Sequence, residues 1–343
     1  MSAALPAVLA VDGGNSKAQV ALVGLTGDLL SCIRGPSISH QAVGLAPGMA
    51  TLRSIVDRAL GVAGSDAIAG VPGGSAGHVA QLGVYCLAGA DYPSDVRLLT
   101  TAIEQLQLTP ASIVRNDTFA ALRAGTHRPW GVALICGQGI NGAGIAPDGR
   151  SARFDGLGHI SGDWGGGGGI GAAALGHAVR ARDGRGPRTT LEQLVPAHFG
   201  VSSAGALTRA LYEERISERR LSELSPVVFR AAEAGDGVAR SILDRQVAEL
   251  VAMAGALIRR LKLTRLDPDV VLAGGVFRAT DPVFYAGIEA GIRAVAPEAR
   301  TVRLTAPPVL GAALVGLDRI HGGATPPEVD ARIRTALEGR HDG

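Results

Sequence analysis

The segment VDGGNSK (Val11–Lys17) decides the fold predicted for this chain of 343 residues. It ends a short apolar run, Val8–Val11, and two further strand patterns follow it at Gln19–Val23 and Leu29–Ile33. Short apolar or alternating runs separated by glycine turns are typical of antiparallel hairpins. The N-terminal sequence therefore predicts a three-stranded antiparallel meander whose first turn is rich in glycine.

The same pattern occurs a second time, around CGQGIN (Cys136–Asn141). Strand patterns at Gly131–Cys136, Asn141–Ala146 and Ser151–Phe154 are separated by glycine turns. Beyond each meander, apolar strand patterns alternate with helical spacing, which is typical of parallel strands covered by helices. The predicted fold class is therefore α/β, with two related lobes that each hold a mixed sheet, an N-terminal antiparallel meander and flanking helices.

The predicted domains follow from this repeat. We expect an N-terminal lobe at residues 1–125, a C-terminal lobe at 126–320 and a polar tail at 321–343. The helix pattern at Leu310–Leu317 leaves open a return of the last helix to the first lobe. Two domains also agree with the chain length, because a domain usually holds about 100–200 residues.

The composition excludes several classes of protein. Apolar residues make up 46% and charged residues 19% of the chain, which excludes a disordered or fibrous protein. The net charge is only +2 and aromatic residues are 3%, so we expect neither a nucleic-acid partner nor a membrane-binding patch. The sequence shows no basic leader and no apolar run of about 18 residues, and Cys32, Cys86 and Cys136 fit no zinc or disulfide spacing. These features predict a cytoplasmic location.

Two common phosphate-binding motifs do not fit the chain. The lysines are only Lys17 and Lys262, and neither stands in a GK[ST] string, which excludes a P-loop. GQGING (Gly137–Gly142) matches the dinucleotide pattern GxGxxG, but a strand rather than a helix follows it, so we reject that interpretation. Backbone amides in a tight glycine turn can still form a nest for phosphate. The two turns together predict a polyphosphate ligand, with Asp12 able to hold Mg²⁺.

Three further segments allow both a structural and a functional interpretation. Asp117 follows a strand and starts a helix, so it is either a helix N-cap or a general base. DGLGHISGDWGGGGGIG (Asp155–Gly171) is either a linker or, as its Trp, Ile and His favour, a ligand loop in which Asp163 accepts hydrogen bonds from hydroxyls. VVLAGGVFR (Val270–Arg278) ends a buried strand in a glycine pair, and spacing alone does not decide between a simple turn and a surface for adenine.

In this order, the motifs resemble those of the sugar kinase, heat-shock ATPase and actin superfamily. Over residues 8–317 the chain more narrowly resembles the BadF/BadG/BcrA/BcrD-type ATPase family, in its N-acetylglucosamine kinase branch. The resemblance implies two ribonuclease-H-like lobes of the actin-like ATPase fold, with ATP and Mg²⁺ as cofactors. It also implies phosphoryl transfer from ATP to a sugar hydroxyl.

The resemblance implies residue roles as well. Asp12 would face Mg²⁺, and Asp117, within RNDTFAA, would be the catalytic base. The positions implied to bind ATP are Gly13, Gly14, Ser16, Gly137, Gln138, Gly139, Gly274, Gly275 and Arg278. The positions implied to bind the sugar are Ser39, His40, Asp91, Ile140, Asn141, Gly156, Leu157, Gly158 and Asp163.

Three positions depart from the family pattern. Ser39 stands where N-acetylglucosamine kinases usually carry Asn, Gln138 where Thr is usual, and Leu157 where an aromatic residue is common. Ser39 and Leu157 would line the sugar pocket, so the departures concern the sugar more than the phosphate machinery. We expect an ATP-dependent kinase that phosphorylates a hydroxyl, O6, of an amino sugar such as N-acetylglucosamine. The alternatives are a glucosamine kinase, an ATPase that activates a radical dehydratase and a non-catalytic sugar sensor; a homodimer is compatible with the sequence.

Overall fold

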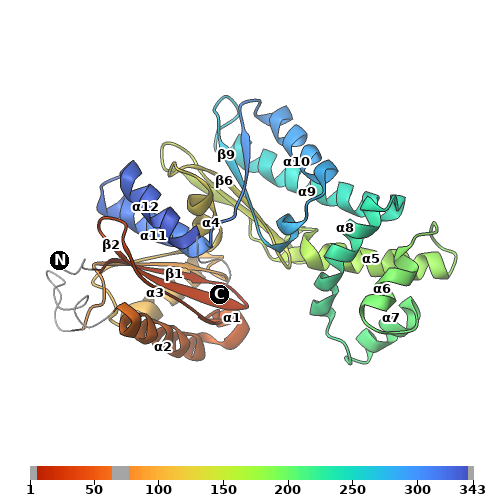
Figure 1. Cartoon of the computed structure of the whole chain (residues 1–343), viewed down its shortest axis with the longest axis horizontal. Coiled ribbons are helices and arrows are strands. Elements are labelled where there is room, and N and C mark those ends of the chain that lie inside the picture. Colours follow the sequence, from red (N-terminus) through yellow and green to blue (C-terminus); the bar gives the residue numbers. More distant parts are fainter. Residues whose placement is uncertain (1–5, 64–76, 339–343) are drawn as a thin grey trace. The chain divides into compact units, whose positions relative to one another are not determined.

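The computed structural model describes residues 6–63 and 77–338. The chain divides into two compact units, and Figure 1 labels their α-helices and several of their strands. The first unit comprises Met1–Gly131, Pro147–Gly149 and Leu304–Gly343, and the second comprises Val132–Ala146 and Arg150–Arg303.

The first unit is built on a five-stranded sheet of order β3-β2-β1-β4-β5. Its strands are β1 (Pro6–Gly13), β2 (Lys17–Gly24), β3 (Leu29–Pro36), β4 (Leu82–Leu87) and β5 (Ser112–Asn116). The pairs β1–β2 and β2–β3 are antiparallel, which confirms the predicted meander, whereas β1–β4 and β4–β5 are parallel. Because parallel strands run in one direction, the carboxyl ends of β1, β4 and β5 lie at the same edge of the sheet.

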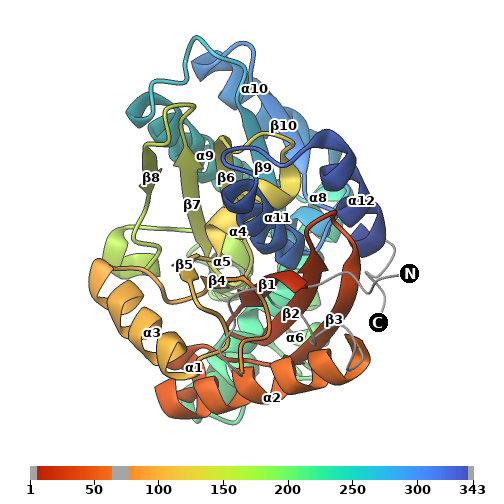
Figure 2. The same cartoon turned by 90° about the vertical axis from the view of Figure 1, so that its left-hand side faces the viewer.

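Helices cover both faces of this sheet, with α2 on one side and α11 on the other (Figure 2). They are α1 (His40–Val43), α2 (Leu45–Ala63), α3 (Pro93–Gln105), α4 (Thr118–Gly125), α11 (Pro308–Ile320) and α12 (Pro327–Glu338). Successive side chains of a strand point to opposite faces. Val8 and Ala10 of β1 accordingly pack with α4, α11 and α12, and Leu9 and Val11 pack with α2 and α3.

The C-terminal helices are fastened to the first unit by close packing and by buried charges. A Cβ at Gly311 would lie 1.8 Å from the carbonyl oxygen of Ala120, so α11 packs directly on the backbone of α4. Arg123 of α4 is 4% exposed; it donates to both carboxylate oxygens of Asp318, at 2.7 and 3.0 Å, and to Asp330 at 3.1 Å. These ion pairs connect α4 to both α11 and α12.

This arrangement differs from the expected boundaries, which assigned residues 126–320 to the second lobe and 321–343 to a polar tail. The second unit ends at Arg303, and α11 packs within the first unit, which is the return that the sequence left open. The described part of the tail is not solvated either, because Val329, Ile333 and Leu337 of α12 are buried in the core of the first unit.

The second unit is built on a sheet of order β10-β9-β6-β7-β8. Its strands are β6 (Gly131–Cys136), β7 (Ile140–Ile145), β8 (Ser151–Arg153), β9 (Asp269–Ala273) and β10 (Arg300–Arg303). Counted within each unit, both sheets have the same strand order, 3-2-1-4-5, and in both the first strand pairs in parallel with the fourth. The predicted pair of related mixed sheets is therefore confirmed.

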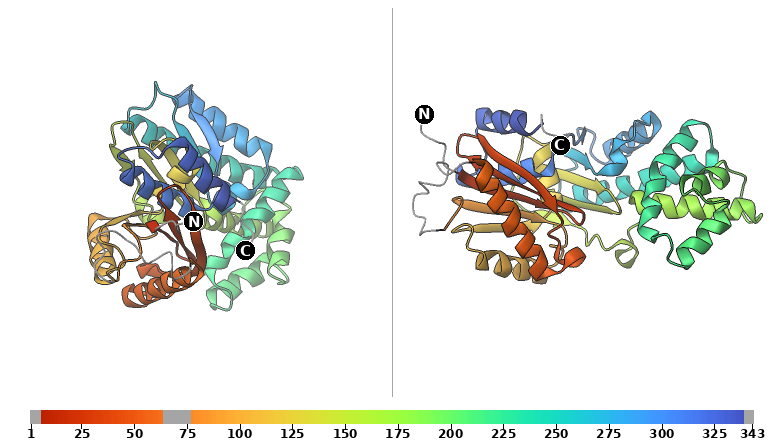
Figure 3. Two further views of the ribbon diagram at one scale, coloured as in Figure 1. Left: turned by 60° about the vertical axis from the view of Figure 1, so that its left-hand side comes forward. Right: turned by 60° about the horizontal axis from the view of Figure 1, so that its bottom comes forward.

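Among the described residues, the second unit has six α-helices, as the first has, and three 3-10 turns besides. They are α5 (Gly166–Arg182), α6 (Leu191–His198), α7 (Ala204–Tyr212), α8 (Ser225–Glu233), α9 (Gly237–Arg260) and α10 (Pro282–Val295), with 3-10 turns η2 (Gly158–Ser161), η3 (Glu218–Leu224) and η4 (Gly275–Arg278). The green helices α5 to α8 form a cluster at one end of this unit (Figure 3). Across residues 6–63 and 77–338, we find no helix whose length and apolar character would let it cross a membrane.

Candidate active site

The turn after β1 packs against neighbouring residues at Gly13 and Gly14 and is exposed at its tip. A Cβ at Gly13 would lie 2.6 Å from Cδ2 of Leu87, so a glycine lets β1 approach β4 closely at this point. The amide of Gly14 donates to the carbonyl of Lys17 at 2.9 Å, and Ser37 Oγ donates to the carbonyl of Gly14 at 3.0 Å. Ser16, at the tip, is exposed. The three predicted phosphate-binding residues of this unit therefore form one ordered turn.

Two carboxylates lie at the edge of the sheet where the parallel strands end. Asp12 pairs in register with Cys86, and Cys86 pairs with Arg115, two residues before Asp117. Burial and the nearby negative charge of Asp117 raise the pKa of Asp12 to about 7, and the opposing charge of Lys17 only partly offsets them.

A pair of carboxylates of this kind fits a divalent cation. Mg²⁺ prefers oxygen ligands, keeps several waters and needs only one or two protein carboxylates beside the phosphates of a substrate. Asp12 is a carboxylate of this kind, because burial and a neighbouring carboxylate disfavour its negative charge in the absence of a cation. Among the described residues, no three side chains of His, Cys, Asp or Glu gather in a way that could hold a metal ion without such additional ligands.

The cap of α4 is supplied by Asn116 and not by the predicted residue, Asp117. Asn116 Oδ1 accepts hydrogen bonds from the amide of Thr118 at 3.1 Å and from its hydroxyl at 2.7 Å. Asp117 occupies the N-cap position, but its side chain makes no capping hydrogen bond. The structural interpretation of Asp117 thus loses its main support. Sequence reasoning missed Asn116, although Asn two residues before Thr is a pattern typical of such local turns.

The predicted sugar-binding residues of the first unit gather beside this cap. Asn116 Nδ2 donates to Asp91 at 2.9 Å, and Gln41 Nε2 donates to the other oxygen of Asp91 at 3.4 Å. Ser39 Oγ and His40 Nδ1 are buried and find no hydrogen-bond partner among the described residues. Buried polar atoms usually have a partner. These two are therefore candidates for binding a polar ligand.

In the second unit, the turn Gly137–Gly139 is held by the start of α5. The amide of Gly167 donates to the carbonyl of Gly137 at 2.7 Å, and that of Gly168 donates to the carbonyl of Gln138 at 2.8 Å. Gln138 Nε2 also donates to the carbonyl of Arg219 at 3.4 Å. Arg219 lies in η3, an element that sequence reasoning missed.

The predicted sugar loop of the second unit closes on itself through Ser161. Ser161 Oγ accepts from the amide of Leu157 at 2.8 Å and donates to the carboxylate of Asp163, and it also lies 3.2 Å from the carbonyl oxygen of Gly158. Gly156 lies against Asn141, since a Cβ there would be 2.4 Å from Asn141 Nδ2. The loop therefore has a defined shape.

The two residues that follow the second phosphate turn differ in what they can offer a ligand. Asn141 Oδ1 accepts from the amide of Gly142 at 2.7 Å, and its side chain is half-buried. The side chain of Ile140 is packed in the protein at 6% exposure. Ile140 can therefore contribute to a site mainly through its backbone.

A cavity of about 690 Å³ brings part of this set together within the second unit. Gln138, Gly158 and Asp163 line it, together with Trp164 and with Arg245, whose guanidinium lies 3.9 Å from the centroid of the Trp164 ring. The cavity thus joins a residue predicted to bind ATP with two that were predicted to bind sugar.

The predicted adenosine turn follows β9. Gly274 has φ +112° and a Cβ there would lie 2.4 Å from the carbonyl oxygen of Cys136, so β9 ends in close contact with the end of β6. At Gly275 a Cβ would meet nothing within 4 Å, and both Gly275 and Arg278 are exposed. This backbone is accessible to a flat ligand.

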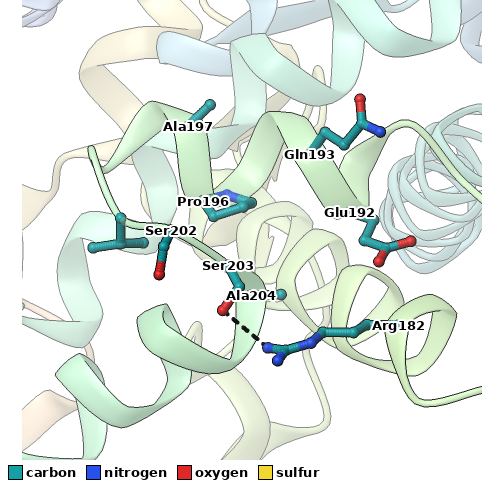
Figure 4. Close-up of a pocket in the computed structure, with 9 residues that line it drawn as sticks. Arg182, Glu192, Gln193, Pro196, Ala197, Ser202, Ser203 and Ala204 are labelled. Atoms are coloured by element: carbon teal, nitrogen blue, oxygen red, sulfur yellow. Dashed lines mark hydrogen bonds between the residues drawn. The ribbon is translucent and has the colours of Figure 1, made fainter.

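A second cavity of about 390 Å³ lies between α6 and the start of α7 (Figure 4). Arg182 points into it and donates to Ser203 Oγ at 2.9 Å. The residues that line it, among them Glu192, Gln193 and Ser202, are not among the predicted site residues.

The buried cysteines are poor candidates for cluster ligands. Burial raises the pKa of Cys136 to about 12 and raises that of Cys86 further above its usual range. A thiolate is the form that binds metals. The thiols of these strands therefore give no support to an iron–sulfur role.

Comparison with known proteins identifies the family of the chain. The BadF/BadG/BcrA/BcrD ATPase family matches residues 11–316. An N-acetylmuramic acid/N-acetylglucosamine kinase of Clostridium acetobutylicum is 29% identical over 272 residues, which cover 78% of this chain and 85% of that protein. An N-acetyl-D-glucosamine kinase of Dictyostelium discoideum is 29% identical over 244 residues, which cover 69% of this chain and 76% of that protein.

Solved structures share the fold. A candidate N-acetylglucosamine kinase from Chromobacterium violaceum superposes with a TM-score of 0.69 at 22% identity, covering 91% of this chain and 99% of the other. A ROK family glucokinase from Streptomyces griseus, in complex with glucose and AMPPNP, gives a TM-score of 0.54 at 17% identity, covering 91% of this chain and 98% of the other.

Proposed function

This chain belongs to the BadF/BadG/BcrA/BcrD ATPase family, and from that premise we propose that it transfers the γ-phosphoryl group of ATP to O6 of an amino sugar, N-acetylglucosamine. The names of the two curated relatives support the sugar and the reaction. The observation that carries the proposal is the placement of Asp117 beside Asp12, with the capping of α4 taken over by Asn116.

In the proposed reaction, Asp117 acts as the general base. Its carboxylate accepts the proton of the sugar hydroxyl while the new bond between that oxygen and the γ-phosphorus forms. The bond from the γ-phosphorus to the bridging oxygen breaks, and ADP leaves. Phosphoryl transfer depends mainly on positioning and on stabilisation of charge, so a base that is fixed at a strand end is suited to it.

Other residues bind and orient the reactants. Mg²⁺, held by Asp12 directly or through water, would neutralise charge on the phosphates. Amides of the turns at Gly13–Ser16 and Gly137–Gly139 would bind phosphate oxygens in place of a P-loop lysine. Ser39, His40, Asp91 and Asp163 would hydrogen-bond the sugar hydroxyls, and the open backbone at Gly275 would receive the adenosine.

The test is sugar-dependent ADP formation by the purified protein with ATP and Mg²⁺. The panel contains N-acetylglucosamine, N-acetylmuramic acid, glucosamine, N-acetylmannosamine and glucose. We expect the highest kcat/KM with N-acetylglucosamine. Preference for glucosamine would replace the proposed substrate with its deacetylated form. Binding of ATP without turnover of any sugar would contradict a kinase.

A further inference from the structure

The first three amides of α5 are all used to hold other parts of the second unit. The opening N–H groups of a helix have no partner inside the helix and must find one elsewhere. Gly167 and Gly168 donate to the carbonyls of Gly137 and Gln138, in the second phosphate turn. Gly166 donates to Oε1 of Gln246, a side chain of α9, at 2.8 Å. The start of α5 therefore connects the phosphate turn to α9.

This junction has almost no spare room. Gly165 has φ +134°, and a Cβ there would lie 2.5 Å from Gln246 Oε1. Gly166 has φ +70°, and a Cβ there would lie 2.5 Å from the carbonyl oxygen of Gly139. Asp163, at the end of the sugar loop, stands only two residues before Gly165. A shift of the α5 start would therefore be transmitted to the turn and to the loop together.

Gln246 is an unusual residue for its position. It is 0% exposed on a face of α9 that otherwise buries apolar side chains such as Leu243 and Leu250. Its Nε2 has no hydrogen-bond partner among the described residues. Burying an amide with unpaired donors is unfavourable, so the side chain is poorly explained by stability alone. Its oxygen, by contrast, accepts the hydrogen bond from Gly166.

We propose that Gln246 is a positioning residue, which fixes the start of α5 and thereby holds the phosphate turn Gly137–Gly139 and the sugar-loop residue Asp163 in one arrangement. It acts through Gly166 and touches neither reactant. The effect on turnover rests on the proposed function, whereas the effect on the junction does not. The two can therefore be tested separately.

The first test is hydrogen–deuterium exchange of the intact protein. Gln246→Met keeps the length of the side chain but removes the acceptor. We expect faster exchange in peptides that contain residues 163–169 and 137–140. The control is Leu250→Ala, one helical turn along the same face of α9, which removes buried apolar volume without touching Gly166. Unchanged exchange in Gln246→Met, or an equal local change in Leu250→Ala, would overturn the proposal.

The second test is kinetic. A displacement of about 1 Å in reacting groups can cost about 10²-fold in rate, so Gln246→Met should lose about 10- to 100-fold in kcat with N-acetylglucosamine. The KM for ATP should change less, and more ADP should form per sugar phosphate. Gln246→Glu should recover most of the kcat, because a carboxylate oxygen can accept from Gly166 near the positive end of the helix.

Leu250→Ala separates positioning from general loss of stability. It should melt at a lower temperature than Gln246→Met and yet keep a higher kcat. A kcat that follows the melting temperature across the three variants would overturn the positioning role. Wild-type protein without sugar turnover would contradict the proposed function instead, and the exchange experiment would then decide the role of Gln246.

Discussion

In the first unit, the central strand β1 ends at Asp12 and Gly13, and the parallel strand β5 ends at Asn116, directly before Asp117. In the second unit, the corresponding strands β6 and β10 end at Cys136 and Arg303. The two sheets share one strand order, so they offer the same positions at the same edge. Among these described strand ends, only those of the first unit carry carboxylates.

In the second unit, the residues at these strand ends contact the turn that follows β9. Arg303 Nη2 donates to the carbonyl of Phe277 at 2.8 Å, which helps to hold η4, the turn after Gly274. Cys136 lies against Gly274. The comparison teaches that one topology can supply a glycine turn twice. Under the proposed function, the residues at the strand ends would give the base and the metal ligand to the first copy and a surface for the nucleotide to the second.

The largest effect on activity is expected when the carboxylate of Asp117, which the second unit lacks at the corresponding position, is removed. A general base contributes about 10²–10⁴-fold to rate, so Asp117→Asn should lose that much of kcat at saturating ATP and sugar. Its melting temperature should stay close to wild type, because Asn116 caps α4.

Asp163→Asn, in the second unit, sharpens the same comparison. Losing one hydrogen-bond acceptor for the sugar should raise the KM for the sugar about 10-fold and leave kcat within a few-fold. Steady-state kinetics of both variants decide the matter. Equal losses of kcat in the Asp117 and Asp163 variants would contradict the assignment of Asp117 as the general base. Full activity of Asp117→Asn would contradict it as well.

The next effect concerns the glycine pair after β9. Gly274→Ala would force an L-residue into φ +112° and a Cβ against the carbonyl oxygen of Cys136, which should cost about 2–3 kcal/mol in the free energy of unfolding. Gly275→Ala is the matched control, since its Cβ would meet nothing within 4 Å. It should keep stability within about 0.5 kcal/mol and raise the KM for ATP.

Thermal melting and ATP titrations of both glycine variants provide the measurement. If Gly275→Ala leaves the KM for ATP unchanged, the adenosine does not lie on this backbone. If Gly274→Ala is as stable as wild type, the close contact with Cys136 is absent.

A smaller effect is expected at Ser39 in the first unit. Its buried Oγ has no partner among the described residues, so Ser39→Ala should leave the free protein as stable as wild type. A hydrogen bond to a sugar hydroxyl is worth about 1 kcal/mol net, so the KM for the sugar should rise about 5-fold. Ser31→Ala removes another buried hydroxyl without a described partner, in β3, and should not change it. Equal KM values for the two variants would remove Ser39 from the sugar site.

An effect on stability alone is expected at Asp12, as a dependence on pH. Its pKa is raised from the ordinary 3.8 to about 7, first by burial and then by Asp117, so the folded protein holds this proton more tightly than the unfolded chain. Stability from this group is greatest at pH values below about 4 and is lost as pH rises toward 7. Without Mg²⁺ or nucleotide, the stability of Asp12→Asn relative to wild type should increase by about 2–3 kcal/mol between pH 5 and pH 8. A constant difference in melting temperature over this range would contradict the raised pKa of Asp12.

Much of the fold could be predicted because its signals are local. VDGGNSK (Val11–Lys17) and CGQGIN (Cys136–Asn141) each mark a strand, a glycine turn and a second strand within a few residues, and both meanders are present. The placement of α12 was not predictable in this way. Its Asp330 and Arg334 resemble surface charges, and their burial depends on Arg123, about two hundred positions earlier in the chain.

The candidate site shows the same limit. Asp12 and Asp117 each end a strand, which is visible in the sequence, whereas their proximity follows from the parallel pairing of β1, β4 and β5. Gln246 lies in a long amphipathic helix, where a polar residue is expected to face solvent. Its contact with Gly166 is a tertiary contact between α9 and α5 and leaves no local pattern.

The central claim is that this chain phosphorylates O6 of an amino sugar. The most direct test is NMR of the product formed by the wild-type protein from ATP, Mg²⁺ and carbon-13-labelled N-acetylglucosamine, with phosphorus–carbon couplings assigned. We predict a phosphomonoester coupled to C6 and formed in equal amount to ADP. Inorganic phosphate without a sugar ester, or an ester coupled to C1 in place of C6, would contradict the claim.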